Sequence, residues 1–336
     1  MKRIALPLLT ILALLVSGCA ATGTGSDSAT LTVYSSQHEN VTNAWVDGFT
    51  KKTGIKVQVR FGKDSSMGAQ IVEEGEASKA DVFLTENSPA MTTVQNADLL
   101  ADVSDTTLAQ VPADRAPSNK KWIGIAARST VLVYNPSMIS EAELPKSLMD
   151  LADPKWKGKW GAGATGADFQ AIIAGMLEAK GADATETWLK AMKTNATVYQ
   201  NNIVTMKAVN AGEIPLGVIY HYYWYRDQVG TKEGSGNTAL YYFKNQDPGA
   251  FVSLSAGGVL KSSKHADDAQ KFLAYVTSAE GQAVLTDSGS KEYAVANGAA
   301  SDPALPPLDS LDSPKIDPFT LNGPKVAELM TQAGLL

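Results

Sequence analysis

Hydrophobic and polar residues alternate near the start of the chain in an order typical of strand, helix and strand. Residues 31–34 have the alternation of a strand, and hydrophobic residues then recur at helical spacing over residues 41–49. Alternation returns at residues 55–61, a helical stretch follows at 67–76, and residues 80–85 form a short apolar strand. This order predicts parallel strands covered by helices.

A second α/β unit is predicted in the middle of the chain. Two extended patterns, at residues 122–128 and 130–134, are expected to cross between two lobes. The elements predicted after them are helices at 169–179, 184–192 and 203–209, a strand at 214–220, a return strand at 257–260, helices at 266–276 and 279–285, and a final helix at 324–333.

The first residues have the pattern of a secretory signal peptide, predicted at residues 1–18. A charged start, Met1-Lys2-Arg3, precedes an apolar run over residues 4–16 that is too short to span a membrane. The following Val16-Ser17-Gly18-Cys19 resembles the bacterial lipobox, in which the cysteine is lipidated and becomes the first residue of the mature protein. The alternative is a chance cysteine beside a signal peptide. Residues 19–30 are small and polar and are predicted to form a lipidated, flexible tether.

Composition bounds the partners and the size of the folded body. Removal of the signal peptide would reduce the 29 basic residues to 27 against 35 acidic ones, a net charge of −8 that argues against nucleic acid as a partner. About 306 residues follow the tether, enough for two lobes rather than one. We expect lobe 1 at residues 31–130, lobe 2 at 131–250, a return to lobe 1 at 251–305, and a C-terminal helical segment at 306–336 that packs on lobe 2.

Four of the 11 tyrosines and one of the three histidines fall in the run at residues 219–227. Phenol oxygens are hard donors, and each becomes an anionic ligand only after losing a proton whose reference pKa is about 10. A highly charged hard cation can drive that loss. Core packing or carbohydrate stacking is the alternative for an aromatic run of this kind.

Short motifs in a fixed order along the chain resemble the bacterial ferric-iron-binding proteins that serve ATP-driven importers. The motifs are residues 34–38 (YSSQH), 53–57 (TGIKV), 80–86 (ADVFLTE), 154–159 (PKWKGK), 222–225 (YYWY) and 246–250 (QDPGA). The resemblance implies a two-lobed α/β fold of the periplasmic-binding-protein-like type II class. In that fold each lobe is a mixed, mostly parallel sheet covered by helices, and the ligand cleft lies between the lobes.

The resemblance also implies a set of iron ligands. In that family a histidine after the first strand, a carboxylate after the third strand and an adjacent tyrosine pair coordinate ferric iron, and the matching residues here are His38, Glu86, Tyr222 and Tyr223. Two phenolates and one carboxylate would balance a trivalent cation, with neutral His38 as a further donor. Because adjacent strand residues point to opposite faces, Tyr222 and Tyr223 are predicted to lie past a strand end, in a turn or a first helical turn. Taken alone, His38 would more often be a loop or core histidine, and Glu86 a helix cap.

The family often completes the iron shell with a small anion, such as carbonate or phosphate, held at a helix amino terminus. The matching residues are Thr165, Gly166, Ala167 and Asp168, and Asn202 matches a polar position that supports the anion. Asp168 departs from the pattern, since a small neutral residue is commoner there. Its carboxylate would repel an anion, cap the helix or approach the metal itself.

Three further residues are assigned supporting roles. Relatives also carry an arginine at Arg128, whose guanidinium near the phenolates would hold them deprotonated; an interlobe salt bridge is the alternative. Asn87 is expected to hydrogen-bond the site across the cleft. His221 is expected to support the site or lie at the surface rather than bind metal.

Together these features predict an exported, monomeric solute-binding protein, lipid-anchored through Cys19 on the extracytoplasmic face of the cell membrane. It would capture ferric iron as its bound solute and deliver it to an ABC permease. The alternative is the same fold binding an organic or oxyanionic solute such as a phosphonate, sulfate or thiamine. We do not expect an enzyme, since the sequence has no G-x-S-x-G or H-E-x-x-H motif.

Overall fold

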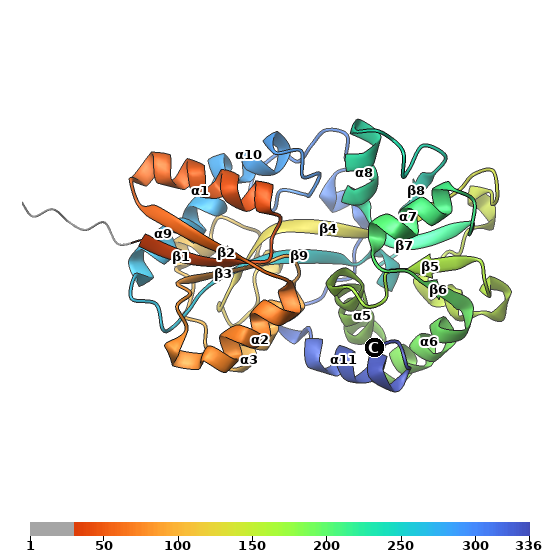
Figure 1. Ribbon diagram of the computed structural model, residues 1–336, viewed down its shortest axis with the longest axis horizontal. Coiled ribbons are helices and arrows are strands. Elements are labelled where there is room, and N and C mark those ends of the chain that lie inside the picture. The colour runs from red at the N-terminus through yellow and green to blue at the C-terminus, as the bar shows by residue number, and fades with distance from the viewer. Residues whose placement is uncertain (1–29) are drawn as a thin grey trace, which may run out of the picture.

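The structure, a computed structural model, describes residues 30–336 (Figure 1). The predicted signal peptide, Cys19 and all but the last residue of the predicted tether lie outside the described residues. The strands are β1 (Thr30–Ser35), β2 (Lys56–Phe61), β3 (Val82–Thr85), β4 (Ile123–Tyr134), β5 (Trp160–Ala162), β6 (Ala196–Val198), β7 (Leu216–Tyr220), β8 (Ala239–Tyr241) and β9 (Val252–Val259). No helix in this part of the chain is long and apolar enough to cross a membrane.

The helices lie between or after these strands, and two of them, α3 and α4, are not predicted by the hydrophobic spacing. They are α1 (Glu39–Thr53), α2 (Asp64–Glu74), α3 (Ser88–Asn96), α4 (Asp105–Leu108), α5 (Ala167–Lys180), α6 (Ala182–Asn195), α7 (Asn202–Asn210), α8 (His221–Val229), α9 (Ala266–Val276), α10 (Ala279–Asp287) and α11 (Gly323–Gln332). Short 3₁₀ helices lie at Gly75–Ala77, Ala113–Arg115, Glu141–Glu143, Leu148–Ala152, Pro154–Trp156, Pro248–Ala250, Leu308–Leu311 and Pro318–Thr320.

One sheet of nine strands runs through the described residues in the order β2-β1-β3-β9-β4-β7-β5-β6, with β8 paired to β4. Parallel pairing joins β1 to β2 and β3 at one end, and β5 to β6 and β7 at the other. The central pairs, β3 with β9 and β4 with β9, β7 and β8, are antiparallel. In Figure 1 α1 covers one face of the first group of parallel strands, and α2 and α3 cover the other.

The strand β4 connects the two ends of the molecule. Its residues pair with β9 from Ile123 to Ser129 and with β7 from Thr130 to Tyr134, and all twelve are buried. The two extended patterns predicted at residues 122–128 and 130–134 are therefore one continuous strand. It joins the second group of strands to the first, with one irregularity in its pairing with β9, at Ile125 between Gly124 and Ala126.

Two large hydrophobic cores lie on either side of this central strand. The first contains Trp45, Phe83 and Phe272 among residues 31–127 and 252–311, and the second contains Trp188 and Met330 among residues 132–251 and 321–335. We therefore propose lobe boundaries close to those drawn from the sequence, with one change. The C-terminal segment is divided, because Leu311 packs in the first core whereas α11 packs in the second.

The return strand begins earlier than its apolar pattern predicts. It was expected at residues 257–260, whereas β9 starts at Val252 and includes Ser253 and Ser255, both fully buried. Their hydroxyls bond to polar side chains of the region between the lobes, so polar residues occupy inward positions that periodicity assigns to apolar ones.

Candidate metal centre

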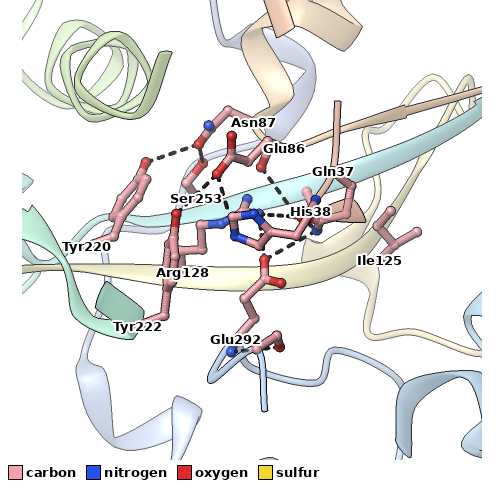
Figure 2. Close-up of polar contacts among 12 residues, drawn as sticks. Gln37, His38, Glu86, Asn87, Ile125, Arg128, Tyr220, Tyr222, Ser253 and Glu292 are labelled. Atoms are coloured by element: carbon pink, nitrogen blue, oxygen red, sulfur yellow. Dashed lines mark hydrogen bonds and ion pairs between the residues drawn. The ribbon is translucent and has the colours of Figure 1, made fainter. Parts of the chain in front are cut away.

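Four connections between elements bring polar side chains together between the two cores. His38 follows β1 directly before α1, and Glu86 follows β3 directly before α3. Tyr222 and Tyr223 lie in the first turn of α8, since β7 ends at Tyr220, and Asp168 lies in the first turn of α5. The tyrosine pair thus lies past the strand end, in the first helical turn. Figure 2 shows the side chains of His38, Glu86 and Tyr222 directed toward one another.

Each phenol of the pair donates a hydrogen bond to a different carboxylate. Tyr222 Oη donates to Glu86 Oε1 at 3.1 Å, and Tyr223 Oη donates to Asp168 Oδ2 at 2.9 Å. The two rings stack with their centroids 4.1 Å apart, which keeps the two pairs adjacent. His38 Nε2 lies 3.8 Å from the same Oε1 of Glu86. The four residues predicted as ligands are therefore gathered, with Asp168 as a fifth.

Asp168 is held in the site by amide groups from both lobes. Its Oδ1 accepts from Asn87 Nδ2 at 2.9 Å, and its Oδ2 accepts from Asn202 Nδ2 at 2.6 Å. The helix-capping alternative for Asp168 is wrong, because the N-cap of α5 is Gly166 and receives no side-chain hydrogen bond. The neighbouring residues of the predicted anion turn lie further out: Thr165 is exposed, and Gly166 and Ala167 are partly buried.

Burial keeps the phenols protonated in this arrangement. It raises the pKa of Tyr222 and of Tyr223 well above the usual value, and the negative charge of Asp168 raises both further. Burial and then the charge of Asp168 also raise the pKa of Glu86. In contrast, burial lowers the pKa of His38, so its imidazole is neutral and has a lone pair for a metal.

A buried ion pair lies behind the tyrosines. Arg128 Nη2 lies 2.5 Å from Glu292 Oε1, and both side chains are fully buried. The same nitrogen donates to Gln37 Oε1 at 3.1 Å, and the guanidinium carbon lies 5.6 Å from the centre of the Tyr222 ring (Figure 2). Burial is the largest single influence on Arg128 and lowers its pKa, but the negative charge of Glu292 together with that of the site residues outweighs burial, and the pKa of the guanidinium is raised. Arg128 is thus placed as expected near one phenol, but its salt bridge joins two segments of the first core rather than two lobes.

His221 forms part of the wall of the site. It is fully buried, so the surface alternative is excluded, and its Nδ1 accepts the backbone N–H of Ser129 at 3.1 Å. The ring stacks on Tyr293 with the centroids 4.6 Å apart. Burial lowers the pKa of His221 to about 3, so the ring is neutral at physiological pH.

Sequence reasoning missed three residues that support the site. Gln37 lies inside a quoted motif but had no role, although its side chain bonds Arg128 and Ser255. Asp64 accepts hydrogen bonds from the backbone N–H groups of Glu86 and Asn87. The sequence marks it only as an acidic residue at the start of a helix, which does not reveal these partners. Glu292 lies outside every regular pattern, and a single sequence carries no signal for it.

A metal site made only of the usual side chains is absent from the described region. No group of three or more His, Cys, Asp and Glu side chains within residues 30–336 is placed to hold a metal ion. The tyrosine oxygens are the further oxygen donors that the structure places beside Glu86 and Asp168. Hard oxygen donors of this kind suit a hard, highly charged cation.

Comparison with known proteins agrees with this chemistry. A sequence profile of the bacterial extracellular solute-binding proteins matches residues 77–318 of the chain. The chain belongs to this family. This solute-binding protein is 60% identical over 306 residues to the Fe(3+)-binding periplasmic protein of Serratia marcescens, over 91% of this chain and 90% of that one. It is 36% identical over 310 residues to the major ferric iron-binding protein of Neisseria meningitidis, over 91% and 93% of the two chains.

A solved structure gives the same result for the fold. Iron-bound HitA from Pseudomonas aeruginosa matches this solute-binding protein with a TM-score of 0.84 and 44% identity, over 91% of this chain and 99% of that chain. The predicted family and the predicted two-lobed α/β fold are both confirmed.

Proposed function

We propose that this solute-binding protein captures ferric iron between its lobes, with Tyr222, Tyr223, Glu86, Asp168 and His38 as the ligands. The observation that carries the proposal is the pairing of each phenol with its own carboxylate, at 3.1 and 2.9 Å. A trivalent cation that displaced the two phenol protons would meet four oxygen donors already directed at one another. His38, neutral and 3.8 Å from Glu86, supplies a nitrogen donor.

We propose further that Asp168 takes the place of the small anion that completes the shell in relatives. With Asp168 the donors carry four negative charges rather than the three expected from the sequence. These exceed the charge of ferric iron by one, and Arg128 beside Tyr222 does not cancel the excess, because its charge is paired with that of Glu292. A free anion brought to the same place would meet the carboxylates of Asp168 and Glu86 and be repelled.

The acidic donor set also disfavours the alternative function. A phosphonate, sulfate or other oxyanion is normally bound by N–H groups and cations. Here the gathered groups are two carboxylates and two phenols, and Arg128 is already paired with Glu292. The Serratia and Neisseria relatives are named for ferric iron, and the Pseudomonas structure is of an iron-bound protein.

The family supports a proposal for delivery and location. Solute-binding proteins of this kind pass their ligand to an ABC permease, and the Serratia relative is named as periplasmic. We propose that this chain is exported, is lipid-anchored through Cys19 on the extracytoplasmic face of the cell membrane, and acts as a monomer.

Iron loading should give the protein a visible phenolate-to-iron charge-transfer band. In Tyr223→Phe this band should weaken, and iron affinity should fall by more than the roughly 10–100-fold typical of losing an outer partner of a metal ligand. Absorption spectra and competition with a chelator measure both effects. Tyr225→Phe, in the same helix, is the matched control and should leave both unchanged. A colourless wild-type protein that does not retain ferric iron would rule out the proposal.

Phosphate should make little difference to iron binding by the wild-type protein, because Asp168 already fills the position of the anion. Asp168→Ala should bind iron more weakly, and added phosphate or carbonate should recover part of the affinity. Titrations in anion-free buffer with and without phosphate make the comparison. A wild-type protein that needs phosphate to bind iron would contradict the role of Asp168.

Iron affinity should rise with pH. Both phenols have raised pKa values and are protonated in the iron-free protein near neutral pH, so binding must release their two protons. Affinity should therefore fall about a hundredfold for each unit by which the pH is lowered in this range. Competition with a chelator of known pH dependence tests this slope. A pH-independent affinity would show that the phenols do not bind as phenolates.

A further inference from the structure

One buried carboxylate near the site has no part in the proposed iron shell. Asp64, the first residue of α2, is only 5% exposed. Its Oδ1 accepts the backbone N–H of Glu86 and its Oδ2 accepts the backbone N–H of Asn87, both at 2.8 Å. Burying a carboxylate costs free energy unless it is hydrogen-bonded, and burial raises the pKa of Asp64 to about 6.

These two bonds fix the direction of the chain where β3 gives way to α3. The strand ends at Thr85 and the helix begins at Ser88, so Glu86 and Asn87 are the whole connection. Both of their N–H groups are tied to one carboxylate on a neighbouring helix. The backbone from which the two side chains leave is therefore held at two consecutive points.

The side chains of Glu86 and Asn87 point from this connection toward Tyr222 and Asp168. Glu86 reaches Tyr222 at 3.1 Å, whereas Asn87 reaches across to Asp168 at 2.9 Å. The amide of Asn87 is itself oriented, because its Oδ1 accepts from Tyr220 at 3.3 Å and from Ser253 at 3.1 Å (Figure 2). Asp64 thus fixes the backbone that carries the carboxylate of Glu86, and it contacts the carboxylate of Asp168 indirectly, through Asn87.

We propose that Asp64 is a positioning residue for iron capture, holding Glu86 and Asn87 so that the carboxylates of Glu86 and Asp168 converge on one ion. This inference rests on the proposed function, because it takes Glu86 and Asp168 to be iron ligands. Asp64 does not bind the ion; it acts through the backbone N–H groups of Glu86 and Asn87 and through the side-chain amide of Asn87. Outer partners of this kind typically change metal affinity by about 10–100-fold when removed.

The chain contains a matched control for a purely structural role. Asp81 is also 5% exposed, and its Oδ2 accepts the backbone N–H of Thr32 at 2.8 Å while its Oδ1 accepts from Ser263 at 2.6 Å. It stands directly before β3, at the opposite end of that strand from Glu86. Both substitutions to asparagine remove a buried carboxylate that accepts backbone N–H, but only one of them borders the site.

The experiment compares Asp64→Asn, Asp81→Asn, Glu86→Ala and the double variant Asp64→Asn/Glu86→Ala. Iron affinity is measured by chelator competition, the charge-transfer band by absorption, and folding by urea denaturation of the iron-free protein. Asp64→Asn should bind iron about 10–100-fold more weakly with a shifted band. Asp81→Asn should keep the wild-type affinity and band. In the Glu86→Ala background the effect of Asp64→Asn should shrink, since part of it passes through Glu86.

The outcomes separate this inference from the proposed function. Glu86→Ala with wild-type affinity would overturn the proposed ligand set. If Glu86→Ala binds iron more weakly but Asp64→Asn has the same affinity and band as Asp81→Asn, the positioning role alone is overturned. A fully additive loss of affinity in the double variant would also overturn it. If Asp64→Asn does not fold, Asp64→Glu keeps the charge but moves the acceptor oxygens. It should then show the same weaker binding and shifted band, and wild-type behaviour of this variant would overturn the role.

Discussion

Two hydrogen bonds, each donated by a phenol to a carboxylate, are the contacts on which the centre of this molecule depends. Four oxygens, from Tyr222, Tyr223, Glu86 and Asp168, lie in a region largely closed to water, and the two carboxylates would repel each other without an intervening donor. Each phenol supplies that donor. The same contacts join the first turn of α8 to the connection after β3 and to the first turn of α5, so they link the two lobes at the site of the proposed ligands. Ferric iron that replaced the two phenol protons would keep this geometry and would put metal–oxygen bonds in place of the hydrogen bonds.

Hydrogen bonds and ion pairs of the surrounding polar groups offset part of the free-energy cost of burying these carboxylates and phenols. Arg128 and Glu292 neutralise each other, and Gln37 links both to the segment that carries His38, since its Oε1 also accepts the backbone N–H of His38 at 2.7 Å. Asn87 lies between Asp64 and Asp168 and spans the lobes. The hydroxyls of the β9 serines, Ser253 and Ser255, turn inward and bond Asn87 and Gln37. The side-chain amides of Asn87 and Gln37 are thus paired with acceptors before iron arrives, whereas Nε and Nη1 of Arg128 have no hydrogen-bond partner among residues 30–336.

The placement of four of the five proposed ligands, all except Asp168, could be predicted because it depends on local rules and on short motifs. His38 and Glu86 follow predicted strands, and the need for two adjacent phenols to face one ion excludes a regular strand for Tyr222 and Tyr223. The supporting residues could not be predicted, because their partners are distant. Gln37 and Glu292 are separated by 255 positions, and no periodicity relates them. The start of β9 was missed for a related reason: inward serines interrupt the apolar pattern on which strand prediction relies.

The central claim is that iron replaces the phenol protons of Tyr222 and Tyr223 and is bound by the phenol and carboxylate oxygens that these protons now connect. Anomalous diffraction at the iron edge from crystals of the loaded protein, grown without phosphate or carbonate, tests it most directly. The account predicts a single iron within bonding distance of the phenol oxygens of Tyr222 and Tyr223 and of the carboxylates of Glu86 and Asp168, with no separate anion. Iron bound away from the tyrosine pair, or bound with Asp168 turned away and an anion in its place, would contradict it.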